Sequence, residues 1–462
     1  MERFLKKQIL LYAAAALLAT NEAAAQEKQD TSQKKQTASY SFSVEQAIEY
    51  GIQNKQTVLN AAVDQEIAQK KVNELKGIGL PQINGFVDAK KFFDIPTQVV
   101  PASAFGGPEG LTQAFQFGLA YNASAGVDAS QLLFDGTYIV GLQASKTYVE
   151  LSEKTYQQSK IETAEMVSKA YYNVLVSTER MEFLDANIAR IKKLMDDTKA
   201  FYDNGFVEKI DVDRVQVTYN NLTNETERAK KNIELSKLLL KFQMGMDLKT
   251  DLTLTDNLKN IKFEEAMPAD EPVDYTKRIE YSILQTNQHL QELDLKKNRF
   301  QYLPSLYAYA DLSTYAYRYD FDFFDSDKGW YPTSFFGAKM SIPVFDGMQR
   351  RSRIAQAKLE LKKTESNFKL LEQSISLETE SSKIKLQNNI ASLITQGKNR
   401  DLAEEVSRVS KIKYDQGVGS NLEVVTAETD YKEAVNNYYL AMYEAIVAKI
   451  DYLKATGTLI KN

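Results

Sequence analysis

The chain contains no cysteine and one histidine, His289, among its 462 residues. Without cysteine there are no disulfides, so an exported chain of this size must be held together by packing or by assembly. The same scarcity removes most nucleophilic and metal-binding chemistry, because thiolate and imidazole groups supply much of it. No nucleophile–base set emerges elsewhere in the sequence. We therefore expect no enzymatic activity, no catalytic residue and no bound metal.

Long hydrophobic runs are absent beyond the first residues. No later segment has 18 consecutive apolar residues, which excludes a transmembrane helix. Residues 1–25 have the pattern of a secretory signal peptide. They combine a basic start, a short apolar run and a small-residue cleavage site: Arg3, Lys6 and Lys7; Ile9 to Leu18; and Ala23 to Ala25. We expect the mature chain to be exported, with residues 26–41 forming a flexible polar linker.

An excess of positive charge is also missing. The formal net charge is −5, and it becomes −6 when residues 1–25 are removed, because they hold three bases and two acids. A mildly acidic chain argues against a nucleic-acid partner.

The chain repeats itself at a nearly constant offset, which is the signature of an internal duplication. Three of the matches are Phe134-Asp135-Gly136 with Phe345-Asp346-Gly347 at 211, Tyr202-Asp203-Asn204-Gly205 with Tyr414-Asp415-Gln416-Gly417 at 212, and Leu80-Pro81-Gln82-Ile83 with Leu303-Pro304-Ser305-Leu306 at 223. The change of offset places about a dozen extra residues in the first half. The Pro- and Gly-rich segment Pro101 to Gly110 is the loop expected to hold them.

Each half has the same predicted order of a helix, a β-hairpin, a very long helix, a turn and a returning helix. The first repeat covers 42–245, with its β-hairpin at 80–135 and its long helical hairpin at 136–245. The second repeat covers 274–456, with its β-hairpin at 303–346 and its long helical hairpin at 347–456. Residues 246–273 read as an irregular insert, and 457–462 as a C-terminal tail.

The two long helices are predicted by a lack of helix breakers. From Gly136 to Gly205 the chain runs 68 residues without proline and with one interior glycine, and from Gly347 to Gly417 it runs 69. At about 1.5 Å per residue, each is a rod of roughly 100 Å, too long for a globular domain to bury. Near the first tip the apolar residues follow a coiled-coil spacing, with Thr198 in the one place that lacks an apolar side chain. These residues are Met181, Leu184, Ile188, Ile191, Met195 and Tyr202.

The returning helices, about Glu208 to Met244 and Ser420 to Ala455, cover only about 55 Å each. We expect the first to be continued end to end by a helix over Asp274 to Tyr302, and the second by a helix over Ser43 to Lys76. Paired rods of equal length predict a hollow α-helical cylinder. The alternative is a solid coiled-coil scaffold, which leaves the β segments unexplained.

Four β-strands are predicted, two in each half. They run from Ile83 to about Val100, Ala114 to Leu133, Leu303 to Phe323 and Thr333 to Val344. In the third strand aromatic residues recur at every second position, which suits the interfacial girdle of an outer-membrane barrel. They are Tyr307, Tyr309, Tyr315, Tyr317, Tyr319, Phe321 and Phe323. Asp311 and Ser313 occupy the same alternate positions as these aromatics and would be costly in lipid, so the register of the strand could shift between them. Which face of the strand meets lipid stays open.

Four strands are too few to close a barrel, and open strand edges are costly in lipid. The sequence therefore predicts an oligomer, and three chains would supply twelve strands and twelve rods.

At each strand-to-helix elbow, Asp135 or Asp346 is placed to cap the N-terminus of the long helix, and the following Gly136 or Gly347 permits a sharp turn. We interpret these residues as structural.

The elbows, the Leu-Pro strand starts, the Tyr-Asp-x-Gly tips and the duplicated order together resemble the TolC-like outer membrane efflux protein family, over Phe42 to Leu459. The resemblance implies long coiled-coil α-helices joined to a four-stranded antiparallel contribution to a trimeric outer-membrane barrel, an α-barrel/β-barrel duct with internal duplication. It implies a belt around the middle formed by residues 246–273 and the C-terminal end, and a duct that needs no cofactor. The implied partners are two further copies, a periplasmic adaptor (membrane fusion) protein, an inner-membrane pump and outer-membrane lipid, in a Gram-negative-type cell with the helices in the periplasm.

The resemblance also assigns roles to residues. The adaptor-docking tips would be Gly205, Phe206 and Val207, with Gly417, Val418 and Gly419. The periplasmic gate would use Glu423 as an acidic ring, and Tyr414 bonded to Asp211 of the neighbouring rod. Two positions depart from the family, because Thr426 and Gly419 stand where a second acid and an arginine are expected.

The expected function is an exit duct that conducts small molecules such as drugs from a pump–adaptor complex across the outer membrane. A duct for type I protein secretion is the nearest alternative, since the pump selects the cargo. A non-conducting periplasmic coiled-coil scaffold is the alternative from another class.

Overall fold

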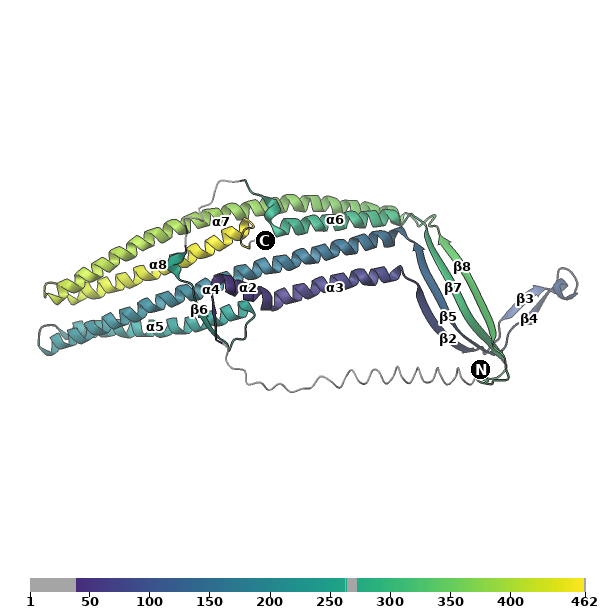
Figure 1. Cartoon of the computed structure of the whole chain (residues 1–462), viewed down its shortest axis with the longest axis horizontal. Coiled ribbons are helices and arrows are strands. Elements are labelled where there is room, and N and C mark those ends of the chain that lie inside the picture. Colours follow the sequence, from purple (N-terminus) through teal and green to yellow (C-terminus); the bar gives the residue numbers. More distant parts are fainter. Residues whose placement is uncertain (1–38, 262, 264–271, 461–462) are drawn as a thin grey trace.

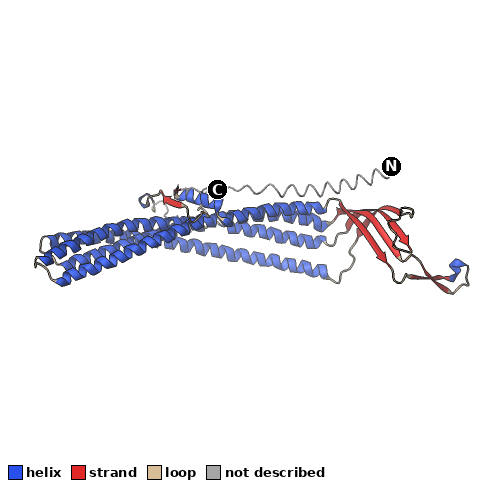
Figure 2. Ribbon diagram, turned by 90° about the horizontal axis from the view of Figure 1, so that it is seen from below, coloured by secondary structure: helices blue, strands red, loops and turns tan. Residues whose placement is uncertain are grey.

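The computed structural model describes residues 39–261, 263 and 272–460. The expected signal peptide and residues 26–38 of the expected linker lie outside these ranges. The chain is a long bundle of helices with a twisted sheet at one end (Figure 1, Figure 2). No helix in the described part of the chain is both long enough and apolar enough to cross a membrane.

Two helices run most of the length of the bundle. α4 (Gly136–Asp203) has 68 residues and α7 (Gln349–Asp415) has 67. Each is therefore about 100 Å long, which confirms the lengths predicted from the spacing of glycines. α5 (Lys209–Met244) returns along α4, and α8 (Asn421–Ala455) returns along α7.

The shorter helices complete the rods in a different pairing from the predicted one. α2 (Val44–Asn54) and α3 (Gln56–Ile78) continue the line of α5, whereas α6 (Ile279–Phe300) continues the line of α8 (Figure 1). The predicted single helix over Ser43 to Lys76 is interrupted at Lys55, whose backbone is extended.

Two hydrogen bonds join the ends of the helices that follow one another along each rod. The Lys55 ammonium donates to Oε1 of Gln243, near the end of α5, at 2.9 Å. The buried guanidinium of Arg278, just before α6, donates to the carbonyl of Ala455, the last residue of α8, at 3.0 Å. The expected continuation of the first returning helix by residues 274–302 is therefore wrong, because these contacts join α6 to α8. A one-turn 3-10 helix, Tyr275–Lys277, precedes α6.

The main sheet has four antiparallel strands, two from each repeat, as predicted. They are β2 (Gln82–Lys91), β5 (Tyr121–Phe134), β7 (Ser305–Arg318) and β8 (Tyr331–Ser341), in the spatial order β2-β5-β7-β8. The two repeats meet where β5 pairs with β7. Among the strands of the described residues, β2 and β8 each have one edge without a partner.

The first β-hairpin is more divided than predicted. Its outer part forms a separate two-stranded ribbon, β3 (Thr97–Pro101) with β4 (Thr112–Gln116), which projects beyond the main sheet. A short 3-10 helix, Ala102–Phe105, lies in the predicted loop. In the second hairpin β7 ends at Arg318, so the aromatics at 319–323 lie in the following loop rather than in the strand.

The segment between the repeats contains a strand that the sequence did not indicate. β6 (Asp251–Leu254) pairs in parallel with β1 (Ser39–Phe42), so residues 39–41 of the expected flexible linker are part of a strand. A 3-10 turn, Leu258–Asn260, follows β6. Most of the remaining insert, 262 and 264–271, lies outside the described residues.

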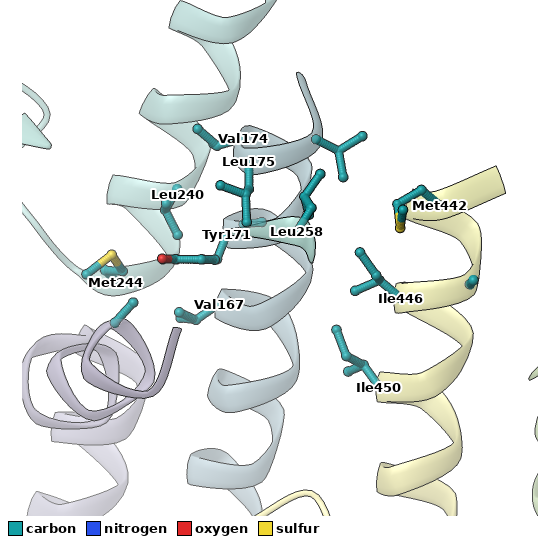
Figure 3. Close-up of a cluster of buried hydrophobic side chains, with 14 of the residues drawn as sticks. Val167, Tyr171, Val174, Leu175, Leu240, Met244, Leu258, Met442, Ile446 and Ile450 are labelled. Carbon is teal, nitrogen blue, oxygen red and sulfur yellow. The ribbon is translucent and has the colours of Figure 1, made fainter. Parts of the chain in front are cut away.

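The largest hydrophobic core lies at mid-length, where this segment meets the helices (Figure 3). Tyr171 of α4 is fully buried at its centre, and its hydroxyl donates to the carbonyl of Phe42 at 2.9 Å. The same hydroxyl accepts from the backbone N–H of Asp256 at 3.3 Å. Burial raises the pKa of Tyr171, which therefore remains a neutral donor. One side chain thus ties the end of β1 and the backbone just after β6 to the long helix.

The first elbow has the predicted cap. The Asp135 carboxylate accepts hydrogen bonds from the backbone N–H groups of Thr137 (2.7 Å) and Tyr138 (3.0 Å). Burial alone would raise the pKa of Asp135, but the bonds from Thr137 and Tyr138 outweigh it and lower the pKa. Gly136 begins α4, and a Cβ there would lie 3.0 Å from the side chain of Leu303 and 3.1 Å from that of Phe300, closer than usual packing.

At the second elbow Asp346 also bonds the first turn of the long helix, but from two residues farther back than Asp135 does. α7 begins only at Gln349, and its N-cap is Met348, whose φ is 68° and whose side chain makes no cap bond. Asp346 instead accepts from the backbone N–H of Arg350 (2.9 Å) and from its Nε (2.7 Å), which lowers the pKa of Asp346. The buried Arg350 also donates to the carbonyl of Gln301 at 3.1 Å. The matching position of the first repeat is Ile139, which has no such donor, so the two elbows fold differently.

Candidate functional site at the helical tips

The two helical hairpins end in identical turns at the end of the bundle remote from the sheet (Figure 1). In the first, the backbone N–H of Phe206 donates to the carbonyl of Phe201, and that of Gly205 to Tyr202, both at 2.9 Å. In the second, Val418 donates to Lys413 at 3.0 Å and Gly417 to Tyr414 at 2.9 Å. This is the Schellman arrangement, which needs a left-handed residue after the helix.

Glycine supplies that residue in both turns. The φ angles of Gly205 and Gly417 are 78° and 75°, where any other L-residue is strained. The next side chains project into solvent, with Phe206 77% and Val418 75% exposed. Large exposed apolar residues at two adjacent tips are typical of an interaction site. Val207 and Gly419 complete the two turns.

A buried polar contact joins the two hairpins just above the tips. Thr198 on α4 is fully buried, and its hydroxyl donates to the carbonyl of Leu194 at 2.7 Å. The same hydroxyl accepts from Nδ2 of Asn421, the first residue of α8, at 3.1 Å. The hydroxyl of Tyr414, at the end of α7, lies 3.3 Å away. Since the single Thr198 proton is directed at Leu194, Tyr414 is the donor in this pair. We call Thr198, Tyr414 and Asn421 the gate contact.

Within the single chain, Tyr414 contacts a different residue from the predicted Asp211. Within the chain Tyr414 meets Thr198 rather than Asp211, and Asp211 forms an ion pair with Arg214 at 2.9 Å on its own helix. The ring of Phe201 adds an edge contact to Tyr414, with ring centroids 6.0 Å apart. Tyr414 therefore does join the two hairpins, but through another acceptor.

A second group of polar contacts lies farther from the tips, and we call it the clasp. Glu225 on α5 accepts from Arg180 of α4 (3.1 Å) and from Lys432 of α8 (3.0 Å). Nε of Arg180 also donates to Oδ1 of Asn436 on α8 at 2.8 Å. Lys432 and Asn436 are four residues apart, so they lie on one face of α8. The clasp is thus an ionic bridge between the first hairpin and the second.

Burial alone would raise the pKa of Glu225, but the bonds and charges of Lys432 and Arg180 outweigh it and lower the pKa. The carboxylate is thereby kept ionised. A buried carboxylate, Glu428, lies one turn of α8 from Lys432 and accepts from Ser407 at 2.7 Å. Nε of Arg190 lies 3.5 Å from the other Glu428 oxygen.

Glu423, the residue predicted for an acidic ring, lies in the first turn of α8 with an exposed side chain. Its backbone N–H donates to the Ser420 hydroxyl at 3.2 Å, which caps the helix. Thr426 is also exposed. Across the described ranges, no group of three or more His, Cys, Asp or Glu residues is arranged to hold a metal ion.

Sequence reasoning missed most of these joining residues. Thr198 was visible as the gap in an apolar spacing, and that gap marks a buried polar contact. Asn421, Arg180, Glu225 and Lys432 gave no signal, because each resembles an ordinary solvated residue on a long helix until its distant partner is known.

The chain belongs to the outer membrane efflux protein family. The family model described as Outer membrane efflux protein matches residues 102–245 and 286–458, more than half of the chain. The outer membrane protein TolC of Escherichia coli (strain K12) is 21% identical over 424 residues, which cover 86% of this chain and 79% of TolC. TolC of Vibrio cholerae serotype O1 is 19% identical over 342 residues, which cover 73% of this chain and 77% of that protein.

Solved structures agree with this assignment. The CmeC outer membrane channel of Campylobacter jejuni has a TM-score of 0.70 at 17% identity, covering 90% of this chain and 85% of that chain. CusC has a TM-score of 0.71 at 15% identity, covering 93% and 95%. The family resemblance and the fold class of long helices joined to a four-stranded sheet are thereby confirmed.

Proposed function

We propose that three copies of this chain form an outer-membrane exit duct for efflux. The observation that carries the proposal is the four-stranded sheet, whose two edges have no partner strand in the described part of the chain, attached to rods about 100 Å long. Edge strands expose backbone donors and acceptors that need partners in lipid. β2 has 10 residues and β8 has 11, so β8 of one copy and β2 of the next are matched in length.

The helices continue this duct through the periplasm toward an inner-membrane pump. The tips, Gly205 to Val207 and Gly417 to Gly419, present Phe206 and Val418 to a periplasmic adaptor. The support is their exposure at the end remote from the sheet. The proposed cargo is small molecules such as drugs. A duct for protein secretion is the nearest alternative, because a duct of the same structure could serve either cargo. The duct itself has no enzymatic role.

The duct opens by separation of the two hairpins at their tips. The gate contact holds the hairpins together where no backbone joins them, and the clasp adds an ionic bridge. Asp211 and Tyr414 belong to this closed end. Glu423 is exposed in the first turn of α8, where three copies would present a ring of carboxylates. Carboxylates placed so close repel one another, which favours a divalent cation bound between them.

The assembly is tested by a heat-sensitive trimer in the outer-membrane fraction, seen as a band that shifts to monomer size on boiling. A protein that stays monomeric and leaves the membrane with mild salt would support the coiled-coil scaffold instead.

Glu423 is tested by divalent-cation block of single channels. We expect Glu423→Gln to weaken the block, whereas Glu433→Gln, an exposed acid farther along α8, should leave it unchanged. An unchanged block in Glu423→Gln would remove Glu423 from the entrance.

A further inference from the structure

The register of the main sheet separates its side chains into two different faces. Residues that pair directly across antiparallel strands lie on the same face. One face, which we call the polar face, carries Tyr309, Asp311, Ser313 and Tyr315 of β7 with their partners on β5 and β8. The other, the apolar face, carries Ala308, Ala310, Leu312 and Thr314 with their partners. Pairing is continuous through this stretch, so the register shift considered for Asp311 and Ser313 does not occur.

Charge divides sharply between the two faces. Five charged residues of the four strands lie on the polar face: Asp88, Lys90, Asp128, Asp311 and Lys339. The other two, Lys91 and Arg318, flank Tyr121 in the last row, at the end of the sheet remote from the helices. The body of the apolar face therefore carries no charge.

The apolar face has the composition of a lipid contact. Val87 and Phe336 on the two edge strands are 84% and 79% exposed in the single chain. At the outer end Tyr121, Phe323 and Trp330 gather over the buried Ala123 and Ala316. Clustered Tyr and Trp at the end of an apolar surface are typical of a membrane interface.

The polar face is the crowded one. A side-chain carbon at Gly126 would lie 2.6 Å from Cβ of Ser313, and one at Gly337 would lie 2.7 Å from the ring of Tyr309. Both glycines are on the polar face, so side chains converge there, as they do on the inner side of a curved sheet.

One row across the middle of the polar face is acidic. Asp128 and Asp311 are direct cross-strand partners, and like charges so placed repel. Asn84 donates to Asp128 at 3.1 Å, and the Ser313 hydroxyl donates to Asp311 at 2.5 Å. These bonds leave carboxylate oxygens that need water, which a lumen supplies and lipid does not.

We propose that the polar face lines the lumen through which cargo leaves, and that Asp128 and Asp311 bias this lumen toward cations. The inference rests on the proposed duct, because three copies place two carboxylates each at one level. It assigns lining and ion preference to residues of the sheet rather than to the tips.

The lining is tested with single cysteines, since the chain has none of its own. Ser124 and Ala125 are adjacent small residues of β5, on the polar and the apolar face respectively. We expect a charged methanethiosulfonate reagent to change the single-channel conductance of Ser124→Cys and to leave that of Ala125→Cys unaltered. Ser124→Cys channels that conduct unchanged after labelling is confirmed by mass, or an effect confined to Ala125→Cys, would overturn the assignment. Failure of the unsubstituted protein to form channels would instead contradict the duct.

The ion preference is tested by the reversal potential in a potassium chloride gradient. We expect Asp128→Asn/Asp311→Asn to lower the cation-to-anion permeability ratio at least twofold. Asp320→Asn, in the loop outside the sheet, is the control. A heat-sensitive trimer of the double variant shows that it has assembled, and an unchanged ratio in that trimer would overturn the role of the two carboxylates.

Discussion

Replacing Thr198 by valine tests the gate contact most selectively. Valine keeps the shape of the side chain and removes the hydroxyl that accepts from Asn421 and from Tyr414. The carbonyl of Leu194 loses little, because it keeps its helical hydrogen bond. In the closed state the two donors are then buried without acceptors, whereas in the open state both reach water.

The size of the effect follows from these two donors. A buried group without a partner costs about 1–3 kcal/mol, so with two such donors the closed state should lose about 2–6 kcal/mol relative to the open one. At about 1.4 kcal/mol for each tenfold change, the open-to-closed ratio should rise at least roughly 30-fold. Single-channel recording in planar bilayers measures this ratio as open probability.

Thr198→Ser is the matched control, because it retains the hydroxyl and loses only a methyl group. It should behave like the unsubstituted protein. If Thr198→Val channels stay as closed as the unsubstituted ones, or if Thr198→Ser opens equally, the buried hydroxyl does not hold the hairpins together.

Three further predictions concern the tips, the clasp and the second elbow. Gly205→Ala should destabilise the first tip turn by about 1–2 kcal/mol and speed amide exchange there, while Gly141→Ala, at an open mid-helix position, should not. The pKa of Glu225 is lowered in the folded state, so its ionic bridge stabilises the closed state above the usual glutamate pKa, and this stabilisation is lost as the pH falls below about 4.3. The open probability should therefore rise in acid, and Glu225→Gln should remove that dependence on pH. Arg350→Met should lower the urea midpoint of helix unfolding by an amount equivalent to about 1–2 kcal/mol, because the Gln301 carbonyl loses its charged donor, and equal midpoints would show that the elbow does not need this residue.

Local chemistry made much of the fold predictable. The spacing of glycines gave the two long helices, because a run without helix breakers leaves few alternatives. The Asp135 cap followed from its place before a helix. For Asp346 the same reasoning gave the bond to the first helical turn but missed the later start of α7 and the ion pair with Arg350, which stands where the first repeat has Ile139.

Long-range pairing was less predictable. The two returning helices could each be continued by either of the two shorter helices, because the shorter helices are similar in length. Helix length therefore could not decide between the two end-to-end pairings. The choice is made by contacts such as that of Arg278 with the Ala455 carbonyl. The gate contact has the same origin, since Thr198 was visible as a gap but its partners are more than 200 residues away.

The faces of the sheet also required the structure. In β7 alone, the tyrosines and Asp311 lie on the same face of the strand. The sequence of this strand therefore does not show whether that face meets lipid or water. The register with β5 adds Asp128 to the same face, and the aromatic cluster around Trp330 lies on the other.

Planar-bilayer recording of the purified, heat-sensitive trimer tests the central claim most directly. A duct closed at its tips should insert and conduct in discrete steps, with low open probability that rises in Thr198→Val. A trimer that inserts but shows no conductance in either form would contradict the account.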